Sequence, residues 1–211
     1  YLFETCLGIP VVSAAPSVLT LYGSKLQLKN ALVIAISQSG KSPDLCEMMQ
    51  MAKDSGAMTV AFVNETQSPL ADIADHCLPL HAGSEKAVAA TKSYLASLSA
   101  LIQFTATLSD NSALLDAGQQ LPSALHASLE QDWSAGVTHF ESANDALVLG
   151  RGYGFPIAQE AALKFKETLS MHAEAFSGAE VIHGPLAIVK PDYPVLMVTQ
   201  NDISLDSMLD L

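Results

Sequence analysis

The chain has 211 residues, 49% of them hydrophobic and 15% charged, which excludes a disordered protein because disorder needs low hydrophobicity and high net charge. Its 22 acidic and 10 basic residues give a net charge of −12, which excludes a nucleic-acid partner and an anionic membrane surface, since both need a basic face on the protein. Three scattered cysteines without a CxxC pair indicate a reduced, cytoplasmic protein, and no apolar run approaches the roughly 18 residues of a membrane span.

Strands and helices alternate along the first part of the chain. The predicted strands are 31–37, 58–63 and 77–80, and the predicted helices are 43–54, 86–109 and 112–132. The first strand is an apolar, β-branched run, as expected of a strand that is buried on both faces. Ser42 and Pro43 suit the cap and the first position of the helix that follows. Pro79 has no N–H to donate within a sheet, so the third strand is predicted at an edge.

The same alternation restarts in the second part of the chain. Strands are predicted at 146–149 and 194–199, with a helix over 156–172 between them. Such alternation predicts parallel βαβ units, and therefore an α/β fold of two subdomains, 1–132 and 133–211. Ligands of parallel sheets bind beyond the carboxyl ends of the strands. We therefore expect the Ser37–Ser42 loop, Asn64 and the Gly150–Gly154 loop at the edge of a site.

The loop after the first strand, Ser37-Gln38-Ser39-Gly40-Lys41-Ser42, is the first candidate for chemistry. It combines several hydroxyl groups, a flexible glycine and the N-terminus of a helix, where backbone N–H groups and the positive end of the helix dipole bind anions. It lacks the spacing of a nucleotide-binding P-loop. An ordinary strand-to-helix turn with a good cap explains the same residues, and both interpretations stay open.

A charged helix face is the second candidate. Glu160, Lys164 and Glu167 are spaced i, i+4 and i+7, which places them within an arc of roughly 60°. Glu–Lys pairs at this spacing are also typical of solvated helix faces. The rest of this helix is largely apolar and follows a glycine-rich loop, which favours a functional stripe. The residue types alone leave both interpretations open.

A histidine in a turn is the third candidate. His183 precedes Gly184 and Pro185, and an imidazole held there can carry a proton near neutral pH. A lone histidine also commonly has a structural role. The remaining histidines show no metal-ligand spacing with cysteine or aspartate, so neither a metal nor a cofactor is predicted.

Taken in order, these segments resemble the sugar isomerase (SIS) domain family. They are similar to its double-SIS group, which includes the isomerase half of glucosamine-6-phosphate synthase and stand-alone isomerising aminosugar-phosphate deaminases. The resemblance implies two SIS-type three-layer αβα subdomains with mainly parallel sheets, the first incomplete at its N-terminus and the second at its C-terminus. It covers nearly the whole chain and rests on Ser37–Gly40, Gly83–Glu85, Ala89–Lys92, Gly150–Gly152, Gln159–Glu167, His172–Ala175 and Glu180–Pro185.

The resemblance also implies which residues bind the substrate. A loop of hydroxyl and amide side chains holds the sugar phosphate in the family, and Ser37, Gln38, Ser39 and Ser42 match it. Val88 matches a position that lines the sugar. A sugar phosphate is therefore the expected partner.

The catalytic roles follow in the same way. Glu167 matches the carboxylate that moves a proton between C1 and C2, Lys164 the lysine beside it, and Glu160 a supporting carboxylate. His183 matches a histidine that assists ring opening and that relatives receive from the neighbouring subunit, which implies a homodimer. These residue types suit the chemistry, because aldose–ketose interconversion needs one base and a nearby cation but no metal.

Three positions depart from the synthase pattern: Ser42 stands for a threonine, Lys41 for an acidic residue, and Ala90 for a serine that contacts the sugar. Neither a glutaminase domain nor the synthase's C-terminal lysine is present, which favours a stand-alone enzyme. The predicted function is a phosphosugar isomerase acting on hexosamine or ketohexose 6-phosphates, and first of all an isomerising glucosamine-6-phosphate deaminase. Two alternatives remain: the isomerase domain of a glutamine–fructose-6-phosphate aminotransferase cut from a longer chain, and a non-catalytic sugar-phosphate sensor.

Overall fold

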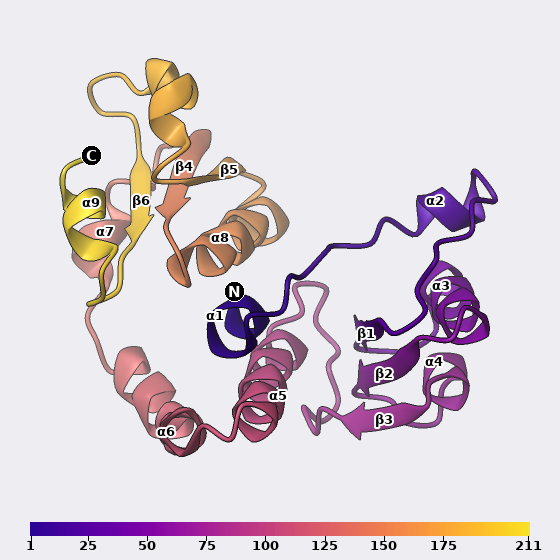
Figure 1. Cartoon of the computed structure of the whole chain (residues 1–211). Helices are drawn as coiled ribbons and strands as arrows, with labels where there is room; N and C mark the ends of the chain where they lie inside the picture. Colours follow the sequence, from indigo (N-terminus) through magenta and orange to yellow (C-terminus); the bar gives the residue numbers. More distant parts are fainter. The chain divides into compact units, whose positions relative to one another are not determined.

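Two compact units make up the chain. The computed structural model describes residues 1–211. The first unit consists of Leu2–Ala124, and the second consists of Leu125–Leu211 together with Tyr1. Each unit holds its own sheet of three parallel strands, labelled in Figure 1. No helix is long and apolar enough to cross a membrane.

The first unit is built around the sheet β1-β2-β3. The pairing is parallel throughout, from Leu32 opposite Met58 to Ser37 opposite Val63. Its elements are α1 (Leu2–Leu7), α2 (Ser17–Thr20), β1 (Leu32–Ser37), α3 (Pro43–Asp54), β2 (Met58–Val63), α4 (Pro69–Ile73), β3 (His76–Pro79), α5 (Lys92–Leu108) and the first part of α6 (Ser112–Leu129).

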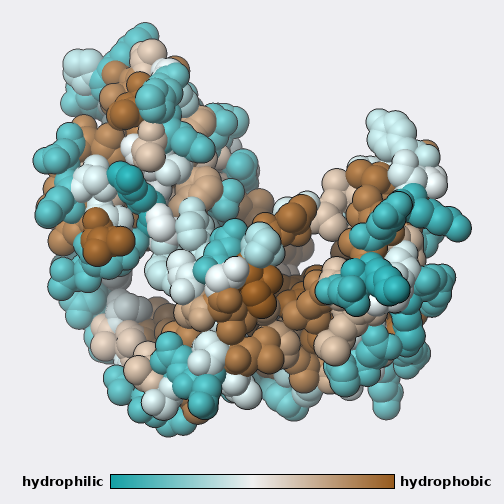
Figure 2. Space-filling view, in the orientation of Figure 1, coloured by the Kyte–Doolittle hydropathy of each residue, from teal (hydrophilic) through white to brown (hydrophobic).

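Helices cover both faces of this sheet. On one face, Ala35, Ala61 and Val63 of the sheet pack against Met49 of α3 and Leu70 of α4. On the other face, buried sheet residues such as Val60 and Phe62 pack against α5, and Phe62 meets Phe104 edge to face with ring centroids 5.5 Å apart. Hydrophilic residues cover the outer side of α3 and α4 in Figure 2. The predicted three-layer arrangement of this unit is confirmed.

A carboxylate joins the amino ends of β2 and β3. The Asp75 carboxylate accepts hydrogen bonds from the Thr59 N–H at 3.0 Å and the Thr59 hydroxyl at 2.7 Å, and Lys53 Nζ lies 3.1 Å from it. Chiefly because of the Thr59 hydroxyl, the pKa of Asp75 falls to about 2. This network holds the register of β3 at the end of the sheet remote from the serine loop.

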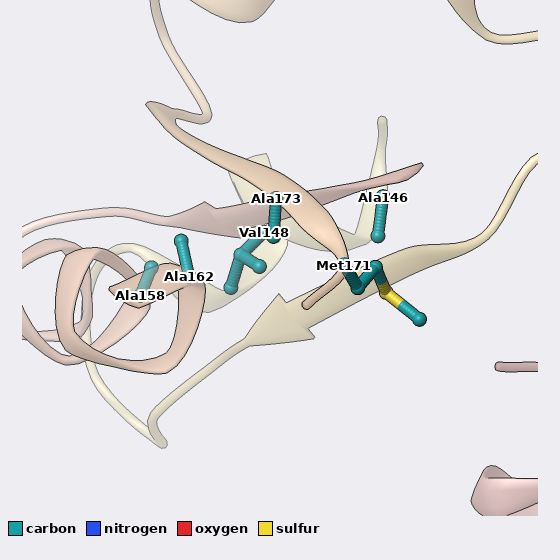
Figure 3. Close-up of a cluster of buried hydrophobic side chains, with 6 residues drawn as sticks. All are labelled: Ala146, Val148, Ala158, Ala162, Met171 and Ala173. Carbon is teal, nitrogen blue, oxygen red and sulfur yellow. The ribbon is translucent and has the colours of Figure 1, made fainter. Parts of the chain in front are cut away.

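The second unit is built around the sheet β5-β4-β6, again with parallel pairs only. On one face, Ala158 and Ala162 of α8 pack against Val148, as Figure 3 shows. The other face is covered by Val181 of η1 and Met208 of α9, which completes three layers. Its elements are α7 (Ser134–Val137), β4 (Asp145–Gly150), α8 (Gly154–Leu169), β5 (His172–Ser177), η1 (Val181–His183), η2 (Pro185–Ile188), β6 (Val195–Val198) and α9 (Leu205–Leu209).

Two predicted helices have different bounds in the structure, and one strand was not predicted. The predicted helix 86–109 begins only at Lys92, and residues 86–91 form a loop. The predicted helix 156–172 spans Gly154–Leu169, because Ser170 takes a left-handed conformation with φ 53°. His172–Ser177 is then a strand that the sequence analysis missed, and it pairs with β4 along its whole length.

Candidate functional site

The serine loop, Ser37–Ser42, connects the carboxyl end of β1 with the N-terminus of α3. The Ser37 hydroxyl oxygen accepts a hydrogen bond from the Gly40 N–H at 3.0 Å, and the Ser39 hydroxyl oxygen accepts one from the Lys41 N–H at 3.4 Å. Ser42 takes the predicted N-cap position of α3 with Pro43 in first position, but its side chain makes no capping hydrogen bond. The loop therefore turns sharply and brings its hydroxyl groups to the positive end of a 12-residue helix.

Gly40 is required by this turn. Its φ is +62°, and a Cβ there would lie 2.1 Å from Ser68 Oγ and 2.7 Å from Ser68 Cβ. Ser68 itself is 2% exposed. The Gly40 carbonyl accepts a hydrogen bond from the Leu70 N–H at 3.1 Å, which ties the serine loop to the start of α4. Only glycine combines this backbone conformation with so close an approach.

A cleft of about 570 Å³ opens next to the serine loop, at the carboxyl ends of β1 and β2. Asn64, the residue after β2, fixes residues 82 and 83, which form the start of the 82–85 wall of the cleft. Its side-chain amide donates to the Gly83 carbonyl at 2.8 Å and accepts from the Ala82 N–H at 2.8 Å. Of the three segments expected at the edge of a site, the serine loop and Asn64 line this cleft, whereas the Gly150–Gly154 loop belongs to the other unit. The cleft is lined by Gln38, Asn64, Glu65, His81, Gly83, Ser84 and Glu85.

Glu85 caps α5 from a distance in sequence. Its carboxylate accepts hydrogen bonds from the backbone N–H groups of Thr91 at 3.0 Å, Lys92 at 2.9 Å and Ser93 at 2.9 Å, and from the Ser93 hydroxyl. Because the first N–H groups of the helix already have this partner, the helix begins at Lys92 and not at 86. Val88, the predicted sugar-lining residue, lies in the intervening loop and is 95% exposed.

Acid is expected to weaken the first unit through two carboxylates. The pKa of Glu85 falls from 4.5 to about 2, chiefly because the Ser93 hydroxyl donates to it, and that of Asp75 falls from 3.8 to about 2. A lowered pKa in the folded state contributes stability above the unfolded pKa and loses it as the pH falls through the folded one. The free energy of unfolding, measured with urea, should therefore fall between pH 4.5 and about 2.

The matched control for this pH dependence is the double variant Asp75→Asn, Glu85→Gln. It should be less stable at neutral pH and show a shallower loss in the same acidic interval. A free energy of unfolding that stays constant down to about pH 2 in the unchanged protein would contradict the assignment.

The charged triad, Glu160, Lys164 and Glu167, lies on one face of α8. Lys164 Nζ is 3.3 Å from Glu160 Oε1 and donates a hydrogen bond to Glu167 Oε2. The three side chains are only 21–31% exposed. Hydrogen bonds to Glu167 and then Glu160 raise the pKa of Lys164, so its ammonium group stays charged at neutral pH. The helical spacing thus yields a cation between two carboxylates.

Close backbone packing fixes the start of α8. A Cβ on Gly150 would lie 2.5 Å from the Gly154 carbonyl oxygen and 2.9 Å from Phe155 Cα, so the strand end and the helix start touch. Gln200, just after β6, donates from Nε2 to the Arg151 carbonyl at 2.8 Å and holds the intervening loop. No local sequence pattern predicts this role of Gln200, because the contact joins residues 49 positions apart.

His183 ends η1 and is exposed. The backbone N–H of His183 donates to the Glu180 carbonyl at 2.9 Å. Gly184 follows with φ 146°, a conformation that favours glycine. The predicted site residues therefore fall into two groups. Ser37, Gln38, Ser39, Ser42 and Val88 belong to the first unit, and Glu160, Lys164, Glu167 and His183 belong to the second.

Comparison with known proteins identifies the class. The SIS domain family matches residues 19–107 and 139–211, and the chain belongs to this family. The isomerizing glutamine–fructose-6-phosphate aminotransferase of Escherichia coli K12 is 36% identical in an alignment of 220 positions that covers 99% of this chain. The predicted resemblance to the isomerase half of the synthase is confirmed.

Solved structures agree with this result. A protein from Silicibacter pomeroyi, provisionally described as a phosphosugar isomerase, has 40% identity and a TM-score of 0.94, with 99% of this chain and 64% of that chain covered. The C-terminal domain of the Francisella tularensis glucosamine-fructose-6-phosphate aminotransferase has 30% identity and a TM-score of 0.88, with 100% and 62% covered. The chain spans about a third of the Escherichia coli aminotransferase, 36% of its length.

Proposed function

We propose that this chain forms an aldose–ketose isomerase of hexose 6-phosphates, and that its favoured reaction is the isomerising deamination of glucosamine 6-phosphate. The observation that carries the proposal is the charged triad in a chain of the SIS family. The Lys164 ammonium contacts both carboxylates, so Glu167 lies directly beside a positive charge. An ionised carboxylate beside a cation is what a carbon-to-carbon proton transfer needs.

The proposed reaction begins with opening of the sugar ring, assisted by His183. Glu167 then takes the proton from C2 of the open-chain aldose and returns it to C1. Between these steps negative charge develops on O1, which the Lys164 ammonium stabilises. With glucosamine 6-phosphate, the amine proton passes to O1 and C2 becomes an imine. Water adds to the imine and ammonia leaves, which gives fructose 6-phosphate.

The substrate phosphate is assigned to the serine loop. Its hydroxyl groups and the N-terminus of α3 supply hydrogen-bond donors and the positive end of a helix dipole, which suit a dianion. Ser37, Gln38, Ser39 and Ser42 are the proposed contacts, and Lys41 in the same loop is exposed and adds a positive charge. We also propose that two copies associate, so that His183 of each copy serves the other.

A second candidate function is the isomerase domain of a glutamine-dependent aminotransferase. The 36% identity to the Escherichia coli enzyme over 99% of this chain favours it. That reaction uses the same proton transfer in the opposite direction, from fructose 6-phosphate and ammonia to glucosamine 6-phosphate. The charged triad serves either direction, because a catalyst lowers the barrier for both.

The test is one assay with the full-length protein. With glucosamine 6-phosphate, equal amounts of ammonia and fructose 6-phosphate are expected. In a parallel reaction, glucosamine 6-phosphate formed from fructose 6-phosphate and glutamine would favour the aminotransferase instead. No product in either reaction, with sugar phosphates still bound, would overturn the enzymatic proposal in favour of a sensor.

A further inference from the structure

A short loop in the first unit, residues 86–90, is held at both ends although it has no regular structure of its own. On the C-terminal side, the Glu85 carboxylate reaches over the loop to three backbone N–H groups at the start of α5. Lys92 Nζ donates in return to the Ser84 carbonyl at 2.6 Å. These two ties run in opposite directions and bring residues 84–85 next to 91–93.

Glu85 is also one of the residues that line the cleft. Glu85 and Ser84 line the cleft beside the serine loop, and Asn64 fastens the wall just before them. Ala82 and Gly83 are therefore fixed to Asn64 at the end of β2, and residues 91–93 are fixed to Glu85. What remains between is the 86–90 loop, which starts at the cleft wall and carries Val88.

Glu85 has its full set of partners within the chain. Each of its two carboxylate oxygens accepts two hydrogen bonds, from two N–H groups at Oε1 and from the Ser93 N–H and hydroxyl at Oε2. A carboxylate used in this way has no need of a ligand and is well suited to hold a loop. No acidic residue stands in the first turn of α5, so no other side chain replaces it.

We propose that Glu85 is a positioning residue of the sugar-phosphate site, which keeps the 86–90 loop at the rim of the cleft without touching the substrate. The inference rests on the proposed function, because it takes the cleft as the place where the sugar binds. Loss of these hydrogen bonds releases the loop, and the free energy needed to order it again when the sugar phosphate binds then weakens binding.

The variant Glu85→Gln tests this, because it keeps the shape of the side chain but replaces one acceptor oxygen by a donor. We expect the KM for the sugar phosphate to rise by about tenfold to a hundredfold, with kcat changed much less, since the loop contributes binding and not proton transfer. Lys92→Met removes the opposite tie and should shift KM in the same direction by a smaller factor. If Glu85→Gln folds poorly, the KM of Lys92→Met tests the same proposal.

Asp75→Asn is the matched control. Asp75 is also a carboxylate with a pKa of about 2 that accepts backbone and hydroxyl hydrogen bonds in the first unit, but it lies at the amino ends of the strands. It should lower the melting temperature without raising KM. An equal rise of KM in both variants would show that Glu85 acts only through the stability of the unit, and would overturn the inference. An unchanged KM in Glu85→Gln would overturn it as well.

Trypsin gives a readout besides activity, since Lys86 lies inside the loop. Cleavage after Lys86 should be faster in Glu85→Gln than in the unchanged protein or in Asp75→Asn, and fructose 6-phosphate should slow it in the unchanged protein. Equal cleavage rates in all three proteins would show that Glu85 does not hold the loop in place, and would overturn the inference. Faster cleavage in Glu85→Gln without any protection by fructose 6-phosphate would instead count against the proposed function of the cleft.

Discussion

Replacing Glu167 with glutamine is expected to reduce kcat by about a thousandfold in the proposed isomerisation of glucosamine 6-phosphate. The amide has nearly the same shape as the carboxylate but cannot take a proton from C2, and a positioned acid–base group contributes factors of about a hundred to ten thousand. Glu160, whose Oε1 lies 3.3 Å from Lys164 Nζ, still offers the lysine a carboxylate partner, so we expect the helix face to be preserved. The measurement is the initial rate of fructose 6-phosphate formation.

Binding should survive the same substitution. The proposed phosphate contacts belong to the serine loop in the other unit, so the Kd for fructose 6-phosphate, measured by calorimetry, should stay within about threefold. Glu47→Gln is the control: Glu47 is an exposed carboxylate on α3 with no assigned role, and its loss should leave kcat unchanged. A kcat of Glu167→Gln equal to that of the control would remove Glu167 from the proton transfer.

The second large effect is on stability. Gly150→Ala is expected to lower the free energy of unfolding by about 3 kcal/mol, at the upper end of the usual cost of overpacking. The added Cβ would lie 2.5 Å from the Gly154 carbonyl oxygen and 2.9 Å from Phe155 Cα, and backbone atoms cannot rotate away as a side chain can. Either α8 or the end of β4 has to move.

Gly136→Ala is the matched control for this prediction. Gly136 lies in α7 with no atom within 4 Å of the added Cβ and no positive φ, so alanine should be neutral or slightly stabilising there. Urea denaturation of the two variants measures the difference. Equal stabilities would show that the contact between β4 and α8 relaxes at little cost.

Local signals accounted for much of the fold. β1, α3 and β2 begin and end within a residue or two of their predicted places, because their apolar runs, Pro43 at the start of α3 and Gly56 just after its end, with φ 81°, all act over a few residues. β5 was missed for the opposite reason. Its residues His172–Ser177 contain no β-branched side chain and only one buried residue, Ala173, so pairing with β4 makes it a strand.

The candidate site shows the same division. The charged triad was predictable, since helical spacing alone brings Glu160, Lys164 and Glu167 to one face, and their ion pairs confirm it. The role of Glu85 was not, because its partners are six to eight residues further along and the sequence favours one long helix through them. Residues 86–91 favour a helix by composition. The helix nevertheless starts after them, because the Glu85 carboxylate, which lies outside the helix, accepts hydrogen bonds from its first N–H groups.

Pro79 has a consequence for solubility at high concentration. β3 is an edge strand, as its proline predicted, and the Leu80 N–H donates to Val63 on the inner side. Backbone N–H and C=O groups of successive residues in a strand point in alternate directions, so those of Cys77 and Pro79 point away from β2. Proline has no N–H. The outer edge of this four-residue strand thus offers a single donor, at Cys77, to a neighbouring molecule. A strand with one donor is a poor template for edge-to-edge aggregation, so this side of the sheet is protected by its own sequence.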